Sequence, residues 1–397
     1  MSTTVINPRI RGFICLTAHP AGCAANVQRQ IQVARNAGPG QGLGTALVVG
    51  SSAGYGLASL ITAVWGHGAN AVSVAFERPG QGEKAGSAGW YNLAEVHRQA
   101  KVEGRKIESI IGDAFSTAIS DQAIAALKAR FGKVDTLVYS LASPKRVDPV
   151  DGTVWSSVLK PNGGVYTAKT INLDTDQIGP ISINPASESE VLATRKVMGG
   201  EDWFRWVEAL AAADLLAPGF RTVAYSYIGP EITHAVYRDG TIGGAKNHLY
   251  ATAKRIDVDL QRRCGGHAWV SVNKALVTQA SSAIPVVPLY IALLYKVMKR
   301  RGSHEGTIEQ IVRLFRDHYA PGKTPVLDSE SRIRVDDWEM APEVQAEVAA
   351  LWPTVETTNL SELSDYASFK TEFRNLFGFE IPGIDYATPV EVEVPLV

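Results

Sequence analysis

A tight glycine turn that joins an apolar run to a helix start is the feature that most constrains the fold of this chain. The apolar run covers residues 46–49, and a helix start follows at residues 57–61. Between them lies Gly50-Ser51-Ser52-Ala53-Gly54-Tyr55-Gly56. A strand, a glycine turn and a helix in this order place unpaired N–H groups and a partial positive charge where a dinucleotide pyrophosphate binds. A plain tight turn is the alternative interpretation, because glycine-rich turns are common.

Strand-like and helix-like segments alternate through the first third of the chain. The predicted strands are residues 46–49, 70–76, 106–111 and 134–140, and the predicted helices between them are 56–65, 89–103 and 121–131. Helices of this length between strands predict a parallel sheet with right-handed crossovers. The spacing G-x-x-x-G-x-G resembles that of short-chain dehydrogenases/reductases. The sequence therefore predicts an α/β fold, a Rossmann-type doubly wound parallel sheet that elaborates the short-chain dehydrogenase/reductase fold.

The remainder of the chain is less regular but shows no internal repeat or low-complexity linker. We expect an insertion with hairpins, further strands and helices, and a polar, acidic tail with two short helical regions. The insertion covers residues 143–183. The further helices are 201–214 and 242–261, and the further strands are 222–228 and 270–277. The two helical regions of the tail lie near 342–352 and 360–377. One elaborated domain over residues 1–397 is predicted, with a nucleotide-binding half (1–142), a catalytic and substrate-binding half (143–320) and a C-terminal helical extension (321–397).

Composition excludes several classes of partner. A formal net charge of -1 gives no reason to expect nucleic acid or an anionic membrane as partner. With three cysteines we expect no disulfide scaffold, and a reducing, intracellular compartment is favoured. The most hydrophobic stretch, residues 284–298, contains Pro285 and Pro288 and is too short to span a bilayer. We expect a soluble, cytoplasmic protein without stable membrane insertion.

Three potential metal ligands, Cys15, His19 and Cys23, lie close together near the start of the chain. Their spacings match no common zinc pattern, and no second ligand pair follows nearby. A buried structural turn is the preferred interpretation, and no metal site is predicted.

Suitable side chains follow the predicted strands at the edge where a dinucleotide would lie. Glu77, after Phe76, is placed to accept hydrogen bonds from the adenosine ribose and to repel a 2′-phosphate, which favours NADH over NADPH. Arg78 complicates this, since a guanidinium there would pair with that phosphate, and a surface-loop Glu is the alternative. The other positions are Asp113 and Ala114 for the adenine, and residues 140–143, with Leu141 and Ala142, for the nicotinamide ribose.

A Tyr/Lys pair is the expected catalytic unit beside such a nucleotide site. The phenol donates a hydrogen bond to a substrate oxygen, and the ammonium holds the nicotinamide ribose and lowers the phenol pKa. No convincing pair four residues apart follows the fourth strand, but Tyr237 and Lys246 are nine positions apart. On an unbroken helix that spacing is a rotation of about 900°, which puts the two on opposite faces. They meet only if a helix starts between them, and Gly240-Thr241 supplies that start with Thr241 as N-cap. Otherwise a packed Tyr and a solvated Lys are expected.

Several longer motifs resemble one family, the FabV-type trans-2-enoyl-ACP reductases, which are similar to the trans-2-enoyl-CoA reductases. The resemblance covers essentially the whole chain. The motifs are the Tyr-x8-Lys pair and the segments 11–15, 17–20, 22–23, 140–144, 198–203, 277–285 and 373–379. The resemblance implies NADH-dependent reduction of the C2–C3 double bond of an enoyl thioester on ACP or CoA, the last step of a fatty-acid elongation cycle, by a monomer.

The resemblance also assigns roles by position. Tyr237 takes the catalytic role, Lys246 the cofactor-binding role, and Tyr227 the role of a second, substrate-contacting tyrosine. Leu276, Val277 and Thr278 match a segment at the nicotinamide end of the cofactor. Some relatives have a second Lys where this chain has Asn247. The family's C-terminal region has been linked to flavin, but no phosphate-binding glycine loop is visible there and the chemistry does not require one.

The predicted NADH site thus combines the glycine turn, the ends of three further strands, one lysine and the segment 276–278. Its residues are Gly50, Ser51, Ser52, Ala53, Gly54, Tyr55, Phe76, Glu77, Asp113, Ala114, Leu141, Ala142, Lys246, Leu276, Val277 and Thr278.

Three alternatives stay open from the sequence. The apolar stretch 283–294 forms one wall of an acyl-chain groove or is a core helix, because periodicity does not separate the two. A carbonyl reductase of the short-chain dehydrogenase type would act on a ketone or a hydroxyacyl thioester, but its expected Tyr-x3-Lys pair is missing. An NAD(H)-sensing protein would bind NADH without turnover.

Overall fold

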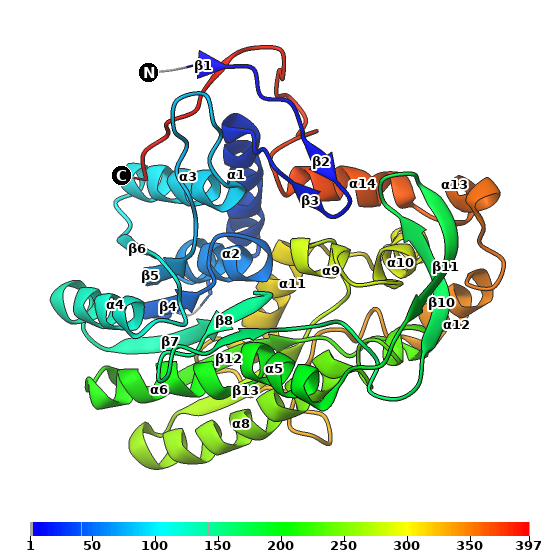
Figure 1. The fold of residues 1–397 in the computed structure, drawn as a ribbon. Helices are drawn as coiled ribbons and strands as arrows, with labels where there is room; N and C mark the ends of the chain where they lie inside the picture. Colours follow the sequence, from blue (N-terminus) through cyan, green and yellow to red (C-terminus); the bar gives the residue numbers. More distant parts are fainter. Residues whose placement is uncertain (1–2, 41, 142, 397) are drawn as a thin grey trace.

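A seven-stranded parallel sheet forms the centre of the protein, in the order β14-β13-β12-β7-β4-β5-β6 (Figure 1). The computed structural model describes residues 3–40, 42–141 and 143–396. The strands are β4 (Thr45–Val49), β5 (Asn70–Ala75), β6 (Ile107–Ile111), β7 (Val134–Tyr139), β12 (Leu216–Ser226), β13 (His267–Val272) and β14 (Ile333–Arg334). The chain runs outward from β4 to β6, then returns beside β4 and runs the other way. This reversal between β4 and β7 confirms the doubly wound Rossmann-type prediction.

Helices cover both faces of the sheet because side chains alternate along each strand. Ala46 and Val48 face one apolar core, and Leu47 and Val49 face the other. The first core is covered by α1 (Pro20–Asn36), α2 (Gly54–Ile61), α3 (Ala88–Val102) and α11 (Thr307–Leu314). The second is covered by α4 (Thr117–Arg130), α6 (Glu201–Ala212) and α8 (Thr241–Cys264). Short π-helical turns continue α2 as η1 (Thr62–Gly66) and α11 as η2 (Phe315–Tyr319).

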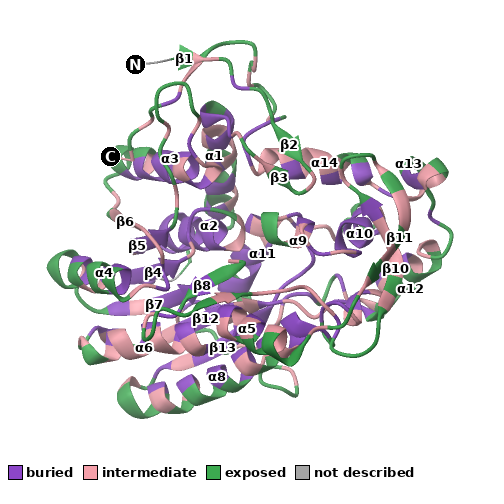
Figure 2. Cartoon of the chain, viewed as in Figure 1, coloured by how far each residue is buried: buried purple, intermediate pink, exposed green. Residues whose placement is uncertain are grey.

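A third apolar core lies beyond the carboxyl end of the sheet and surrounds α10 (Val287–Arg301) (Figure 2). Around it pack the hairpin β10 (Tyr166–Asn172) and β11 (Gln177–Ile183) and the C-terminal elements. The latter are α12 (Pro342–Leu351), η3 (Thr357–Asn359), α13 (Leu360–Leu363) and α14 (Tyr366–Asn375). Ile6 and Val392 belong to the same core, and β1 (Thr3–Thr4) pairs with β15 (Val390–Glu391). Both ends of the chain therefore join this core.

The predicted insertion is confirmed as two hairpins. Its first hairpin joins β8 (Lys145–Val147) to β9 (Val154–Ser156), and β10–β11 is the second. The remaining short elements are β2 (Ile10–Arg11), β3 (Ile14–Cys15), α5 (Glu188–Met198), α7 (Glu231–His234) and α9 (Gln279–Ser282). In the described parts of the chain, no helix combines the length and the apolar character needed to cross a membrane.

Several predicted boundaries differ from the observed ones. The strand predicted over 222–228 begins at Leu216, and two other differences have identifiable causes. Helix α4 begins at Thr117 rather than 121, because the Ser116 side chain accepts a hydrogen bond from Ile119 N and caps it. The strand predicted over 270–277 ends at Val272, and from Lys274 onward the backbone is bound by side chains instead of by a neighbouring strand.

His19 has a structural role, as the sequence interpretation preferred. Its Nδ1 accepts a hydrogen bond from Gly22 N at 3.2 Å and caps α1. Among the residues that the structure describes, no group of three or more His, Cys, Asp or Glu side chains is arranged to hold a metal ion.

Candidate active site

The glycine turn lies where the strand order reverses, between the ends of β4 and β7. Gly50 has φ +85°, and a Cβ there would lie 2.2 Å from the carbonyl oxygen of Ser140. A Cβ at Gly56 would lie 1.8 Å from the carbonyl oxygen of Gly50. Helix α2 starts after Ala53, which offers no side-chain cap. The N–H groups of its first turn are therefore directed to the space beyond the strands, which fits a pyrophosphate.

Serines connect this turn to the end of β5. The Ser51 hydroxyl donates to the carbonyl of Val74 at 3.1 Å, and the Ser52 hydroxyl donates to Oε1 of Glu77 at 2.5 Å. Gly89 leaves the space for this carboxylate, since a Cβ there would lie 2.1 Å from Glu77 Oε1. The Glu77 carboxylate thus lies beside the glycine turn, where the sequence predicts the adenosine ribose.

The other predicted strand-end residues have different surroundings. Phe76 is 79% exposed at the carboxyl end of β5, whereas Ala114 is buried. The Asp113 carboxylate accepts a hydrogen bond from Phe115 N, so it shapes its own loop. The Leu141 side chain lies against Gly50, within 3.2 Å of a Cβ built there. Ala142 lies outside the described residues.

Tyr237 lies in a turn, and the helix that contains Lys246 starts after it, as the spacing of the pair requires. Helix α8 begins at Thr241, and Gly243 N donates to the carbonyl of Tyr237 at 2.9 Å. A Cβ at Gly243 would lie 1.7 Å from the carbonyl oxygen of Arg238, so glycine permits this close return. The prediction of Thr241 as N-cap is wrong. Gly240 is the N-cap, because the Thr241 hydroxyl donates to the carbonyl of Val158 in the insertion.

Both members of the pair approach the carboxyl end of β12. The Tyr237 ring meets the Tyr227 ring edge to face, with centroids 4.9 Å apart and an interplanar angle of 80°. The Lys246 Nζ donates to the carbonyl of Tyr225 at 2.9 Å. Burial lowers the pKa of Lys246 to about 8, and burial, with a smaller effect from Tyr250, raises the pKa of Tyr237. A neutral phenol and an ammonium therefore lie near one strand end.

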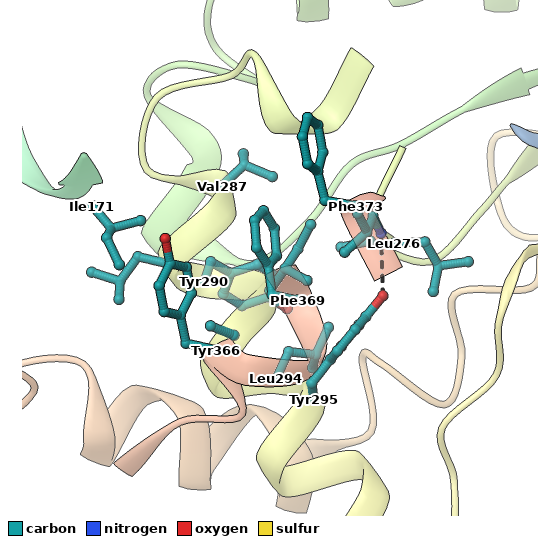
Figure 3. Close-up of a cluster of buried hydrophobic side chains, with 14 of the residues drawn as sticks. Ile171, Leu276, Val287, Tyr290, Leu294, Tyr295, Tyr366, Phe369 and Phe373 are labelled. Carbon is teal, nitrogen blue, oxygen red and sulfur yellow. Dashed lines mark hydrogen bonds between the residues drawn. The ribbon is translucent and has the colours of Figure 1, made fainter. Parts of the chain in front are cut away.

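After β13, Asn273 N still donates to the carbonyl of Ser226 in β12 at 2.9 Å, but the segment 274–278 is held by hydrogen bonds to side chains. Lys274 N donates to Gln310 Oε1, Ala275 N to Glu339 Oε2, and Val277 N to the Tyr295 hydroxyl. Figure 3 shows the Tyr295 hydroxyl reaching this segment. Because these acceptors come from α11, α10 and the turn after β14, the backbone at 274–278 is not free to extend β13.

The same segment contacts the glycine turn. The Tyr55 hydroxyl donates to the carbonyl of Lys274 at 2.7 Å. A Cβ at Gly54 would lie 3.9 Å from Cγ2 of Thr278, while Leu276 and Val277 are buried in the third core. The structure therefore brings three predicted parts of the site together, namely the glycine turn, the end of β12 and the segment 276–278.

Several residues of this region were not predicted from the sequence. Gln310, Glu339 and Tyr295 bind the backbone of 274–278, and Tyr225 provides the carbonyl that receives Lys246. No local pattern marks them, because Glu339 lies 64 residues from Ala275 and 112 from Tyr227. From the sequence, the only indication of such partners was the predicted contact of residues 276–278 with the nicotinamide, because a backbone segment in a binding site has to be held in place.

Helix α10 is buried over most of its length and exposed only at its end, Lys299–Arg301, which favours the core-helix interpretation of the apolar stretch. Val287 and the residues from Leu289 to Tyr295 are at most 2% exposed, and the helix packs against Phe369 and Phe373 of α14 and Ile171 of β10 (Figure 3). Just before it, Val286 has φ +74°, an unusual conformation for a β-branched residue. Its N–H donates to the Thr170 hydroxyl at 3.2 Å, so the insertion hairpin holds this strained turn.

Three family models match consecutive parts of the chain. The NAD(P)H binding domain of trans-2-enoyl-CoA reductase matches residues 5–82, and the trans-2-enoyl-CoA reductase catalytic region matches residues 84–319. The enoyl reductase FAD binding domain matches residues 327–390.

Relatives of known name match over nearly the full length. The enoyl-[acyl-carrier-protein] reductase [NADH] of Opitutus terrae is 52% identical, with 99% of this chain and 100% of the relative covered. The trans-2-enoyl-CoA reductase [NADH] of Clostridium perfringens is 51% identical, covering 98% of this chain and 99% of the relative. The crystal structure of the Treponema denticola trans-2-enoyl-CoA reductase with NAD superposes with a TM-score of 0.94 at 46% identity, covering 99% and 100%. That of the Clostridium acetobutulicum enzyme with NADH gives 0.95 at 41% identity, covering 98% of each chain.

The residues of the segment 327–390 do not fit a flavin. Its apolar side chains, among them Val348 and Phe369, fill the third core. Only two glycines occur in it, Gly378 and Gly383. A Cβ at Gly378 would lie 2.5 Å from Cys23 N, so this glycine permits contact with α1 instead of forming a phosphate loop. No step of the chemistry is assigned to a flavin.

Proposed function

This chain belongs to the trans-2-enoyl-CoA reductase family, and from that premise we propose that it uses NADH to reduce the C2–C3 double bond of trans-2-enoyl thioesters. The thioester is carried by ACP or CoA, and the reaction is the last step of a fatty-acid elongation cycle. One observation carries the proposal: the two phenols of Tyr227 and Tyr237 and the ammonium of Lys246 gather at one strand end, beside a glycine turn that fits a pyrophosphate.

Bound NADH supplies the hydride that adds to C3 of the enoyl group. Negative charge then develops on the thioester oxygen, and the Tyr237 phenol stabilises it by a hydrogen bond in a site from which water is largely excluded. Tyr227 contacts the substrate beside it, and C2 takes up a proton that comes from the solvent to complete the reduction. The Lys246 ammonium holds the nicotinamide ribose and provides the positive charge that favours the enolate.

The same residues that the sequence indicated are proposed to hold NADH. The glycine turn 50–55 would bind the pyrophosphate, Glu77 would accept hydrogen bonds from both hydroxyls of the adenosine ribose, and Phe76, Asp113 and Ala114 would contact the adenine. Leu141, Lys246 and the segment 276–278 would bind the nicotinamide end; Ala142, also expected there from the sequence, lies outside the described residues. The position of the Glu77 carboxylate, bonded to Ser52 next to the turn, supports this arrangement.

Absorbance at 340 nm tests the proposed function directly. We expect NADH oxidation that depends on crotonyl-CoA or an enoyl-ACP, with a clear preference for NADH over NADPH. Oxidation with acetoacetyl-CoA in place of the enoyl thioesters would instead identify a carbonyl reductase. Tight NADH binding without oxidation by any thioester would identify an NADH-sensing protein. A comparison of enoyl-ACP with enoyl-CoA of several chain lengths then identifies the preferred carrier.

We propose that the 397 residues act as one structural unit and as a monomer. The third core supports a single unit, because it takes residues from the start of the chain, the insertion and the C-terminal helices. Light scattering coupled to gel filtration tests the monomer: a mass near 42.7 kDa agrees with it, and twice that mass contradicts it.

A further inference from the structure

A buried glutamate from the C-terminal part of the chain reaches the proposed active site. Glu339 lies in the turn after β14 and is 0% exposed. This turn belongs to the part of the chain that matches a flavin-binding model but does not fit a flavin. Because no flavin is assigned to this part of the chain, the Glu339 side chain needs another explanation.

Three donors from three different elements bind the Glu339 carboxylate. Oε1 accepts hydrogen bonds from the Tyr227 hydroxyl at 3.0 Å and from the Tyr290 hydroxyl at 2.7 Å. Oε2 accepts one from Ala275 N at 2.7 Å. One carboxylate thus joins the end of β12, helix α10 and the segment that leads to 276–278.

The carboxylate is itself held in one position. Gln345 of α12 donates to the Glu339 carbonyl at 2.7 Å and to the Tyr290 hydroxyl at 3.1 Å. Burial raises the pKa of Glu339, while the Tyr290 hydrogen bond and the charge of the buried Lys274 act to lower it. A carboxylate with several donors and a nearby cation is a rigid, directional acceptor in a dry site.

This acceptor determines how Tyr227 lies. A phenol has one O–H, and here that O–H is directed at Glu339, so rotation of the Tyr227 side chain would break the bond. With its hydroxyl fixed, the Tyr227 ring presents itself edge to face to the Tyr237 ring, 4.9 Å away. The same carboxylate fixes Ala275 N, one residue before the predicted nicotinamide contacts.

We propose that Glu339 is a positioning residue that fixes the substrate-contacting Tyr227 and the segment 275–278 relative to each other. The inference rests on the proposed function, because it assigns Glu339 a role through Tyr227 and the nicotinamide end of the site. It also gives the C-terminal extension a function in hydride transfer: the extension supplies a fixed acceptor instead of a flavin site.

The test is a comparison of Glu339→Gln, Tyr227→Phe and the double variant. Glutamine has the same shape but one acceptor oxygen, so its amide cannot serve both the tyrosines and Ala275 N. We expect kcat for crotonyl-CoA to fall by about 10- to 100-fold in Glu339→Gln, as for a small misplacement of reacting groups, with the Kd for NADH little changed. A larger primary isotope effect with 4-deuterated NADH is also expected, because hydride transfer is the slowed step.

Coupling between the two positions separates positioning from a general loss of stability. If Glu339 acts through Tyr227, the double variant loses little more activity than the more impaired single variant. Multiplicative losses in the double variant, or wild-type kcat in Glu339→Gln, overturn the proposal. Glu339→Asp keeps the charge on a shorter side chain that cannot reach all three donors, and it provides the same comparison if the Gln variant does not fold.

Glu305→Gln is the matched control. Glu305 is also a buried glutamate, and it binds Arg313 at 2.7 Å, while Arg313 keeps Asp337 and the Val335 carbonyl as further partners. We expect a lower melting temperature with unchanged kcat; an equal loss of kcat in this control overturns the proposal. Failure of the wild-type enzyme to oxidise NADH with any enoyl thioester would instead refute the proposed function, so the two failures are distinguishable.

Discussion

Burial acts in opposite directions on the two ionisable side chains that meet the end of β12. It raises the pKa of the Tyr237 phenol and lowers that of the Lys246 ammonium to about 8. The phenol therefore stays protonated and able to donate across the working range of pH. The ammonium, in contrast, changes charge close to that range.

The Lys246 pKa predicts a pH dependence of NADH binding. Below about pH 8 Lys246 carries its charge, and above it the neutral amine would bind the nicotinamide ribose, its proposed partner, less strongly. We expect the Kd for NADH, followed by protein fluorescence, to rise as the pH increases through this value. In Lys246→Arg the rise should disappear, because a guanidinium stays charged; persistence of the rise would point to Lys274, whose pKa is also lowered to about 8.

The same shift affects stability with a definite sign. The folded pKa of about 8 lies below the ordinary value of 10.5, so between these values the unfolded chain binds more protons than the folded chain. The contribution of Lys246 to the free energy of unfolding therefore increases as the pH rises across that window. Stability is therefore expected to rise with pH while NADH affinity falls, so the two pH profiles can be told apart.

Removal of the Tyr237 hydroxyl should act on turnover and leave cofactor binding intact. In Tyr237→Phe we expect kcat for an enoyl thioester to fall by about 10²- to 10⁴-fold, the usual contribution of a positioned proton donor. The Kd for NADH should be unchanged. Tyr386→Phe is the control, since the Tyr386 hydroxyl accepts a hydrogen bond from Ile381 N and donates one to the carbonyl of Gly378, both outside the proposed site. Wild-type rates in Tyr237→Phe would remove this residue from the mechanism.

The charge of Glu77 should set the preference between the two nicotinamide cofactors. Glu77→Gln keeps an oxygen for the ribose and for Ser52 but removes the repulsion of a 2′-phosphate, so kcat/KM with NADPH should rise by about tenfold or more. Glu83→Gln changes an exposed carboxylate in the same loop and should alter neither cofactor. Equal kcat/KM of the wild-type enzyme with NADH and NADPH would contradict the ribose assignment.

At the scale of elements, local sequence patterns predicted what depends on neighbours in the chain. The strand, turn and helix around Gly50 and the helix start between Tyr237 and Lys246 follow from residues a few positions apart. The end of β13 and the cap of α8 were missed because distant groups determine them. Glu339 and Gln310 bind the backbone after Val272, and the carbonyl of Val158 takes the hydroxyl that Thr241 would need as a cap.

Two adjacent glycines at the start of α8 allow a matched test of the turn that leads from Tyr237 into this helix. A Cβ at Gly243 would lie 1.7 Å from the Arg238 carbonyl oxygen, whereas nothing lies within 4 Å of one at Gly244. Gly243→Ala should therefore displace the chain around Tyr237 and abolish most enoyl-dependent NADH oxidation. Gly244→Ala should keep activity and raise the free energy of unfolding by about 0.5–1 kcal/mol, because alanine is the better helix former. Similar activity in both variants would show that the close return of α8 is unnecessary.

At the scale of the whole molecule, the sheet could be predicted and the third core could not. Each strand and helix of the Rossmann unit carries its own pattern and packs on a neighbour close in the sequence. The third core instead combines residues as distant as Ile6, Ile171, Leu276 and Phe369, and each of these alone is an ordinary apolar residue. The sequence therefore predicted a helical extension at the C-terminus but not its contact with the site.

This shared core predicts that the C-terminal extension and the nucleotide-binding half unfold together. Phe369 of α14 is 1% exposed, so Phe369→Ala should lower the free energy of unfolding by about 3–5 kcal/mol. Calorimetry should show one transition at a lower temperature, with NADH binding lost in that same transition. Val258→Ala, at a position 56% exposed, should leave the transition unchanged. An early transition that leaves NADH binding intact would mean that residues 321–397 fold as a separate unit, and Glu339 would then lack the rigid attachment that its positioning role requires.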